Sequence, residues 1–144
     1  MKTTITHFLQ EQSCANICVV DAAGKPYCFS CFYVFDAEEG LLHFKSSNDT
    51  YHVRLLKNNP NVAGTVLPDS LNKLIVKGIQ LEGCLLPAHH PLVAQAHRRY
   101  LRKYPMSAVI AGEVWTIQVN FVKFTNSSKV FGKKTIWNRA AMEV

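Results

Sequence analysis

The sequence predicts a mainly β protein, an antiparallel β-barrel of six or seven strands with two or three added helices. Short stretches rich in β-branched and aromatic residues alternate with compact turns of Gly, Pro, Asn and Asp, and one longer helical segment interrupts them. The length of 144 residues, 48% of them hydrophobic, suits one domain, residues 1–144, with a substantial core.

The first half of the chain is expected to hold two short helices and three strands. Ile5, Phe8 and Leu9 share one face of a helix over residues 3–12. A second helix begins at residue 49 or 50 and ends at the Asn-Asn-Pro break of residues 58–60. Strands joined by tight turns are predicted over residues 14–20, 26–35 and 41–45.

The second half is expected to alternate strands with one clear helix. A strand over residues 62–67 precedes a long bent strand over residues 73–86, where Gly83 marks a bulge or a close approach. Pro91 and Pro105 bracket one helix over residues 91–104. Residues 113–124 alternate as a strand with Trp115, Ile117, Val119 and Phe121 on one face.

The net charge of +6 fits either a solvated basic surface or a site for a small anionic ligand. A nucleic acid partner is disfavoured because the sequence has no clustered aromatic RNA-binding motif. No signal-peptide pattern is present, and no apolar run approaches the roughly 20 residues that cross a membrane. The sequence therefore predicts a cytoplasmic protein with no membrane partner.

Five cysteines, an odd number without a secretion signal, predict reduced thiols. Cys28 and Cys31 have the CxxC spacing of metal and redox sites, but positions three apart on a strand point to opposite faces. The favoured interpretation is that the cysteines are small apolar core residues. No metal site is predicted.

The order of elements over residues 26–68 resembles the FMN-binding split barrels of the pyridoxamine 5'-phosphate oxidase-like superfamily, and the resemblance covers about residues 14–137. The Phe-Gly-Lys-Lys-x-Ile-Trp pattern of residues 131–137 resembles the ending of a small bacterial subgroup of that superfamily. The resemblance implies a six-stranded antiparallel split β-barrel of the FMN-binding type, a homodimer with FMN at the subunit interface.

The resemblance also implies a set of cofactor-binding residues. Hydroxyl groups before a helix N-terminus suit a phosphate, and two lysines near the carboxy terminus would close the site. The isoalloxazine side is Cys28, Phe29, Ser30, Cys31 and Phe32; the phosphate side is Ser46, Ser47, Thr50, Tyr51 and His52; the closing pair is Lys133 and Lys134.

Tyr51 and His52 stand where the family has Arg and Lys. Losing two charge-assisted hydrogen bonds to a phosphate costs about 3 kcal/mol or more. Lys133 and Lys134 are therefore expected to supply compensating charge, with Phe131 or Trp137 as a stacking surface.

The sequence offers no nucleophilic or acid–base catalytic set of its own, so no catalytic residue is assigned. This fits a flavoprotein, because the cofactor then carries the chemistry. The leading hypothesis is an FMN-dependent oxidoreductase that uses a nicotinamide donor or a small-molecule substrate. Oxidation of pyridoxamine phosphate itself is not expected, since that enzyme's Arg- and His-containing substrate motif is missing. The alternative is a non-catalytic binding or sensing module that has lost FMN and takes another anionic ligand or haem.

Overall fold

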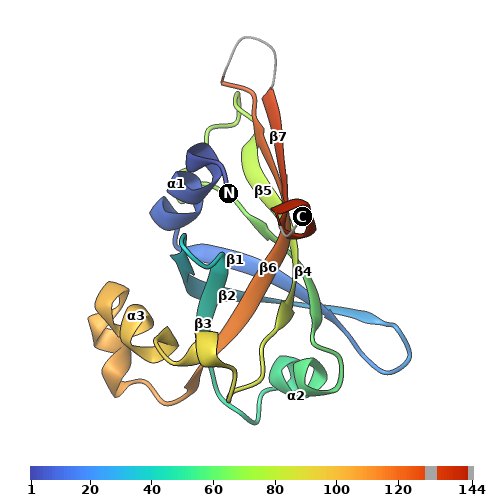
Figure 1. The fold of residues 1–144 in the computed structure, drawn as a ribbon, viewed down its shortest axis with the longest axis vertical. Coiled ribbons are helices and arrows are strands. Elements are labelled where there is room, and N and C mark those ends of the chain that lie inside the picture. Colours follow the sequence, from blue (N-terminus) through green and yellow to red (C-terminus); the bar gives the residue numbers. More distant parts are fainter. Residues whose placement is uncertain (129–132, 143–144) are drawn as a thin grey trace.

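The computed structural model describes residues 1–128 and 133–142. Its strands form one sheet in the order β3-β2-β1-β4-β5-β6-β7, and pairing of β3 with β6 closes the first six into an antiparallel barrel (Figure 1). This confirms the predicted fold class. The strands are β1 (Cys14–Val20), β2 (Pro26–Asp36), β3 (Leu41–Ser46), β4 (Asn61–Val66), β5 (Lys77–Leu85), β6 (Glu113–Asn126) and β7 (Lys133–Asn138).

Within the described residues, three α-helices lie outside the barrel: α1 (Thr3–Glu11), α2 (Tyr51–Asn58) and α3 (Ala96–Lys103). Figure 1 shows α1 and α2 on well separated parts of the barrel. Helix α1 buries Ile5, Phe8 and Leu9, the apolar face that the sequence predicts, and α2 buries Val53, Leu55 and Leu56. None of the described helices is long and apolar enough to cross a lipid bilayer.

Two predicted elements differ in extent. Strand β5 begins at Lys77 instead of residue 73, because residues 67–76 form an exposed connection in which the Leu74 side chain is 93% exposed. The helix predicted over residues 91–104 is divided into a 3-10 turn, Pro91–Val93, and α3. Gln95, at φ −100° and ψ 1°, lies outside the helical region and separates the two.

A β-bulge between β5 and β6 corrects one predicted strand face. Gly83 pairs with Val119 and Glu82 pairs with Phe121, so Asn120 has no opposite residue. A Cβ atom at Gly83 would lie 2.3 Å from the carbonyl oxygen of Gln118, which explains why the bulge needs glycine. The extra residue reverses the alternation, and Phe121 faces away from the core instead of sharing a face with Val119.

The prediction that the cysteines are core residues is wrong at two positions. Cys14 and Cys28 are exposed, while Cys18, Cys31 and Cys84 are half-buried, and all five are free thiols. Cys14, Cys18 and Cys28 occupy positions of β1 and β2 that alternate with the buried residues of these strands, so their side chains lie at or near the surface.

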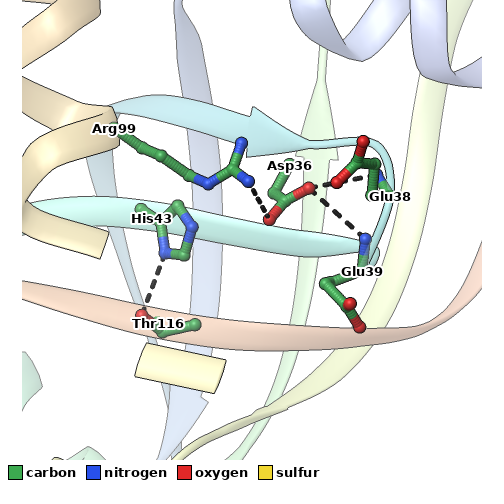
Figure 2. Close-up of polar contacts among 6 residues, drawn as sticks. All are labelled: Asp36, Glu38, Glu39, His43, Arg99 and Thr116. Carbon is green, nitrogen blue, oxygen red and sulfur yellow. Dashed lines mark hydrogen bonds and ion pairs between the residues drawn. The ribbon is translucent and has the colours of Figure 1, made fainter. Parts of the chain in front are cut away.

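A polar cluster around the buried Asp36 carboxylate holds α3 against the barrel (Figure 2). The Arg99 guanidinium of α3 lies 3.3 Å from the Asp36 carboxylate at the end of β2, and Asp36 also accepts hydrogen bonds from the backbone N–H groups of the following turn. His43 of β3 is fully buried, with Nδ1 2.9 Å from the Thr116 hydroxyl of β6. Burial lowers the pKa of His43 to about 4, an effect that Asp36 opposes and Arg99 reinforces.

A candidate cofactor site

A cavity of about 250 Å³ lies where β2, the end of β3, α2 and the segment after α3 meet. The fold brings these four parts of the chain together around a mixture of aromatic, hydroxyl and basic side chains. The lining residues are Phe29, Ser30, Cys31, Phe32, Lys45, Ser46, His52, Tyr100, Ser107, Ile110 and Ala111.

One end of the cavity is polar. The Ser46 hydroxyl lies 2.6 Å from Nε2 of His52, and the Thr50 hydroxyl lies 3.3 Å from the same nitrogen while donating to the Ser47 carbonyl at 2.9 Å. The Trp115 indole N–H donates to the Ser46 carbonyl at 2.9 Å, which fixes the end of β3. Burial lowers the pKa of His52, so its ring is neutral at pH 7.

Aromatic side chains also line the cavity, beside this polar cluster. The Phe29 ring stacks on His52 with centroids 3.8 Å apart and an interplanar angle of 10°. Phe32 is 62% exposed at the mouth of the cavity, 6.0 Å from the Tyr104 ring. Burial raises the pKa of Cys31 to about 12, so this thiol stays protonated. The exposed Phe32 ring offers a surface against which a planar ring system could pack.

Lys45 and Ser107 belong to the cavity but were missed by the sequence analysis. The Lys45 ammonium donates to the Ser107 carbonyl at 2.6 Å. The Ser107 hydroxyl is buried without a hydrogen-bond partner among the described residues. Because Lys45 directly precedes the predicted site residue Ser46, its sequence position could have indicated that it lies near the site. Ser107 reaches the site only through the packing of the segment after α3.

The structure brings together about half of the predicted site. Phe29, Ser30, Cys31, Phe32, Ser46 and His52 line the cavity, and Thr50 bonds to two of them. Of the remaining predicted residues, all of which the structure describes, Cys28, Ser47, Tyr51, Lys133 and Lys134 are not part of its lining.

Tyr51 is turned toward the neighbouring hairpin. Its ring is 45% exposed, meets the Tyr27 ring edge-on at 4.9 Å and lies under the Arg54 guanidinium at 5.8 Å. His52 is therefore the residue of the first turn of α2 that faces the cavity, and α2 contributes no charged side chain to the described lining.

Lys133 and Lys134 lie at the far end of β6 within one chain. They pair with Asn126 and Thr125, whereas Ser46 pairs with Glu113 at the opposite end of the same strand (Figure 1). They can therefore approach this cavity only from a second subunit, and their role in the site stays a prediction. The predicted stacking residue Phe131 lies outside the described residues.

Comparison with known proteins finds close relatives over nearly the whole chain. A UPF0306 protein of Yersinia pseudotuberculosis is 34% identical over 135 residues, which are 94% of this chain and 91% of the relative. The chain belongs to the UPF0306 family. A UPF0306 protein of Yersinia enterocolitica is 31% identical over the same shares of the two chains. No protein-family model matches the sequence.

Solved structures similar to this UPF0306 chain share its split-barrel fold at low identity. A haem-binding protein from Mycobacterium smegmatis has a TM-score of 0.77 at 15% identity, covering 98% of this chain and 60% of that protein. A NimC/NimA family protein from Clostridium acetobutylicum has a TM-score of 0.63 at 16% identity, covering 93% and 91%. An F420 reductase has a TM-score of 0.59 at 17% identity, covering 81% and 93%. These likenesses agree with the expected split barrel.

Proposed function

We propose that this UPF0306 protein binds FMN in the cavity between β2, β3 and α2, and that it is an oxidoreductase using a nicotinamide donor or another small-molecule substrate. The observation that carries the proposal is a cavity whose lining combines the Ser46 hydroxyl, the Lys45 side chain and the exposed Phe32 ring. Hydroxyl and ammonium donors suit a phosphate, and an aromatic ring suits a flavin.

The polar end fits a phosphate through neutral donors and one cation. The Ser46 and Thr50 hydroxyls can donate to phosphate oxygens, and His52 can donate once protonated by the approach of the anion. Lys45 lines the same cavity and supplies a positive charge where Tyr51 and His52 supply none. One charge-assisted bond from Lys45 would restore about 1.5–3 kcal/mol.

A homodimer would complete the site. The cavity of about 250 Å³ is smaller than the roughly 300–1,000 Å³ of sites that enclose a small ligand. Its rim leaves apolar side chains open to solvent, with Phe32 62% and Ile110 60% exposed. A partner subunit covering this rim would enlarge the enclosed volume, exclude water and offer its own Lys133 and Lys134 to the cofactor.

The bound FMN would supply the electron and hydride chemistry. The residues of this chain would bind and orient it, with the hydroxyl cluster and Lys45 at the phosphate and the exposed Phe32 against the ring system. The protonated Cys31 thiol adds a small apolar contact to the same wall.

Quenching of flavin fluorescence tests the proposal. FMN and riboflavin, which lacks the phosphate, are titrated with wild-type protein, Lys45→Ala and the matched surface variant Lys25→Ala. We expect micromolar FMN binding, a tenfold or larger loss in Lys45→Ala for FMN alone, and no change in Lys25→Ala. FMN fluorescence unaffected by micromolar wild-type protein would refute the proposal.

A second candidate function is the binding of haem or another anionic ligand without catalysis. Tyr51 is turned outward, and no charged side chain of the described α2 lines the cavity. The charged contacts to the FMN phosphate that the family pattern implies are therefore missing at this helix, which favours a ligand other than FMN. The similar fold of the haem-binding protein from Mycobacterium smegmatis agrees with it. A Soret band on adding haemin, together with no response to FMN, would establish this alternative over the first.

A further inference from the structure

Two cysteines face each other across the hairpin formed by β1 and β2. Cys18 and Cys28 are directly opposite in the register of the two antiparallel strands. They lie at equal distances from the turn of residues 21–25, which joins the strands. None of the residues proposed above to bind a cofactor depends on this pairing.

The hydrogen-bond pattern of the hairpin fixes the geometry of the pair. Tyr33 donates its backbone N–H to the Ser13 carbonyl, and Asp21 donates its backbone N–H to the Lys25 carbonyl, so both pairs are of the hydrogen-bonded type. Because the two types alternate along an antiparallel ladder, Cys18 and Cys28 form a non-hydrogen-bonded pair.

In such a pair the Cα atoms are about 4.5 Å apart and the side chains approach closely. A disulfide requires Cα atoms about 4.4–6.8 Å apart. The two thiols can therefore be joined with the backbone in place.

The neighbouring pair on the same face confirms how closely these side chains approach. Asn16 and Ser30 occupy the preceding non-hydrogen-bonded position, and the Ser30 hydroxyl donates to the Asn16 side-chain oxygen at 2.6 Å. Burial raises the pKa of Cys18, and the neighbouring Cys28 thiol raises it further.

The pair is open to small reagents. Both side chains line a cavity of about 400 Å³ on the outer face of β1, β4 and β5, and Cys28 is exposed. No other pair of cysteines is directly opposite in the described ladders: Cys14 pairs with Phe32, and Cys31 pairs with Ala15. A metal is the weaker interpretation, because the described residues contain no group of three candidate metal ligands.

We propose that Cys18 and Cys28 are a reversible thiol-oxidation site that closes to an intramolecular disulfide with a small-molecule disulfide of the glutathione type as oxidant. The exposed Cys28 thiolate attacks one sulfur of the oxidant, forms a mixed disulfide and releases one thiol. The Cys18 thiolate then attacks the Cys28 sulfur and releases the second thiol. Two protein thiols are oxidised and one disulfide is reduced to two thiols, so atoms and electrons balance.

Thiol counting by mass spectrometry tests the proposal on the full chain. Reduced native protein is incubated with glutathione disulfide, denatured in iodoacetamide and weighed intact. Of the five cysteines, we expect two to escape alkylation, and dithiothreitol to restore both. Cleavage before Asp21 and Asp36 should then leave the peptide of residues 1–20 linked to that of residues 21–35.

Three single variants identify the pair. Cys18→Ser and Cys28→Ser should each abolish the internal link, whereas Cys14→Ser, an exposed cysteine of the same strand, should keep it. Alkylation of all five wild-type thiols after the incubation would overturn the proposal. So would loss of the link in Cys14→Ser, or a disulfide-linked dimer as the product on a gel without reductant.

Discussion

Lowering the pH from 7 to 5 is expected to destabilise this protein through His43. The side chain is 1% exposed, Nδ1 contacts the Thr116 hydroxyl, and Nε2 has no partner among the described residues. A second proton on the ring would therefore add a charge that is buried with no acceptor at Nε2. Asp36 and Arg99 are the charged groups that face it, and their opposite effects leave burial as the dominant cause of the lowered pKa.

The magnitude follows from the two pKa values. The unfolded chain takes up a proton as the pH falls through 6.5, whereas the folded protein does so only near a pKa of about 4. Between these values the unfolded state binds more protons, so the free energy of unfolding falls with pH. At 1.36 kcal/mol per pKa unit the full loss is about 3 kcal/mol. About 2 kcal/mol of this is lost between pH 7 and pH 5.

Urea unfolding followed by circular dichroism at the two pH values measures this loss. His43→Asn keeps a side-chain amide near the position of Nδ1 and removes the titration, so its loss should be smaller than the wild-type loss by about 2 kcal/mol. His89→Asn, at an exposed position, should behave as the wild type. An equal loss in wild type and His43→Asn would refute the reasoning, whatever the absolute stability of the variant.

Three further predictions concern the bulge, α3 and the carboxy-terminal lysines. Gly83→Ala should lower the free energy of unfolding by about 2–3 kcal/mol, since the added Cβ meets backbone of β6; a urea midpoint close to that of the wild type would contradict this. Asp36→Ala and Arg99→Ala should each cost about 3 kcal/mol, because the first removes a buried carboxylate with its turn contacts and the second leaves that carboxylate without its counter-ion; a loss below about 1 kcal/mol for either variant in urea unfolding would contradict this. Lys133→Ala with Lys134→Ala should weaken FMN binding tenfold or more in the fluorescence titration, and unchanged affinity would exclude a role for them at the phosphate.

Local patterns were sufficient to predict most elements of the barrel. The strand over residues 14–20 matches β1 because its turn residues and apolar alternation act within a few positions. The face of Phe121 was predicted wrongly because the bulge that reverses it depends on the contact of Gly83 with a neighbouring strand. Such a contact leaves no periodic trace in the sequence of β6 itself.

In the candidate site too, residues that are close in sequence could be predicted, whereas residues brought in by tertiary packing could not. Ser46, Thr50 and His52 lie within one strand, loop and helix, so their grouping follows from local order. Ser107 lies more than fifty residues after His52 in the sequence, in a segment that follows α3 and packs on the barrel. No local sequence pattern predicts that it lines the site. The pairing of Cys18 with Cys28 follows from the register of the hairpin, which the turn of residues 21–25 sets. Predicting this pair would have required assigning the residues of β1 to their opposite residues in β2.

Closure of the barrel by β3 and β6 also sets the order in which the molecule can assemble. Leu41 pairs with Gln118, so the closing ladder joins positions separated by about half of the chain. The hairpin of β1 and β2 can form as soon as residue 36 is available, but the ring of strands cannot close during synthesis until β6 has emerged. Folding dominated by such distant pairing is slow, roughly milliseconds to seconds. During that interval the open edges of β3 and of the growing sheet are exposed to other chains, and the concentration of newly made protein will decide how often they meet.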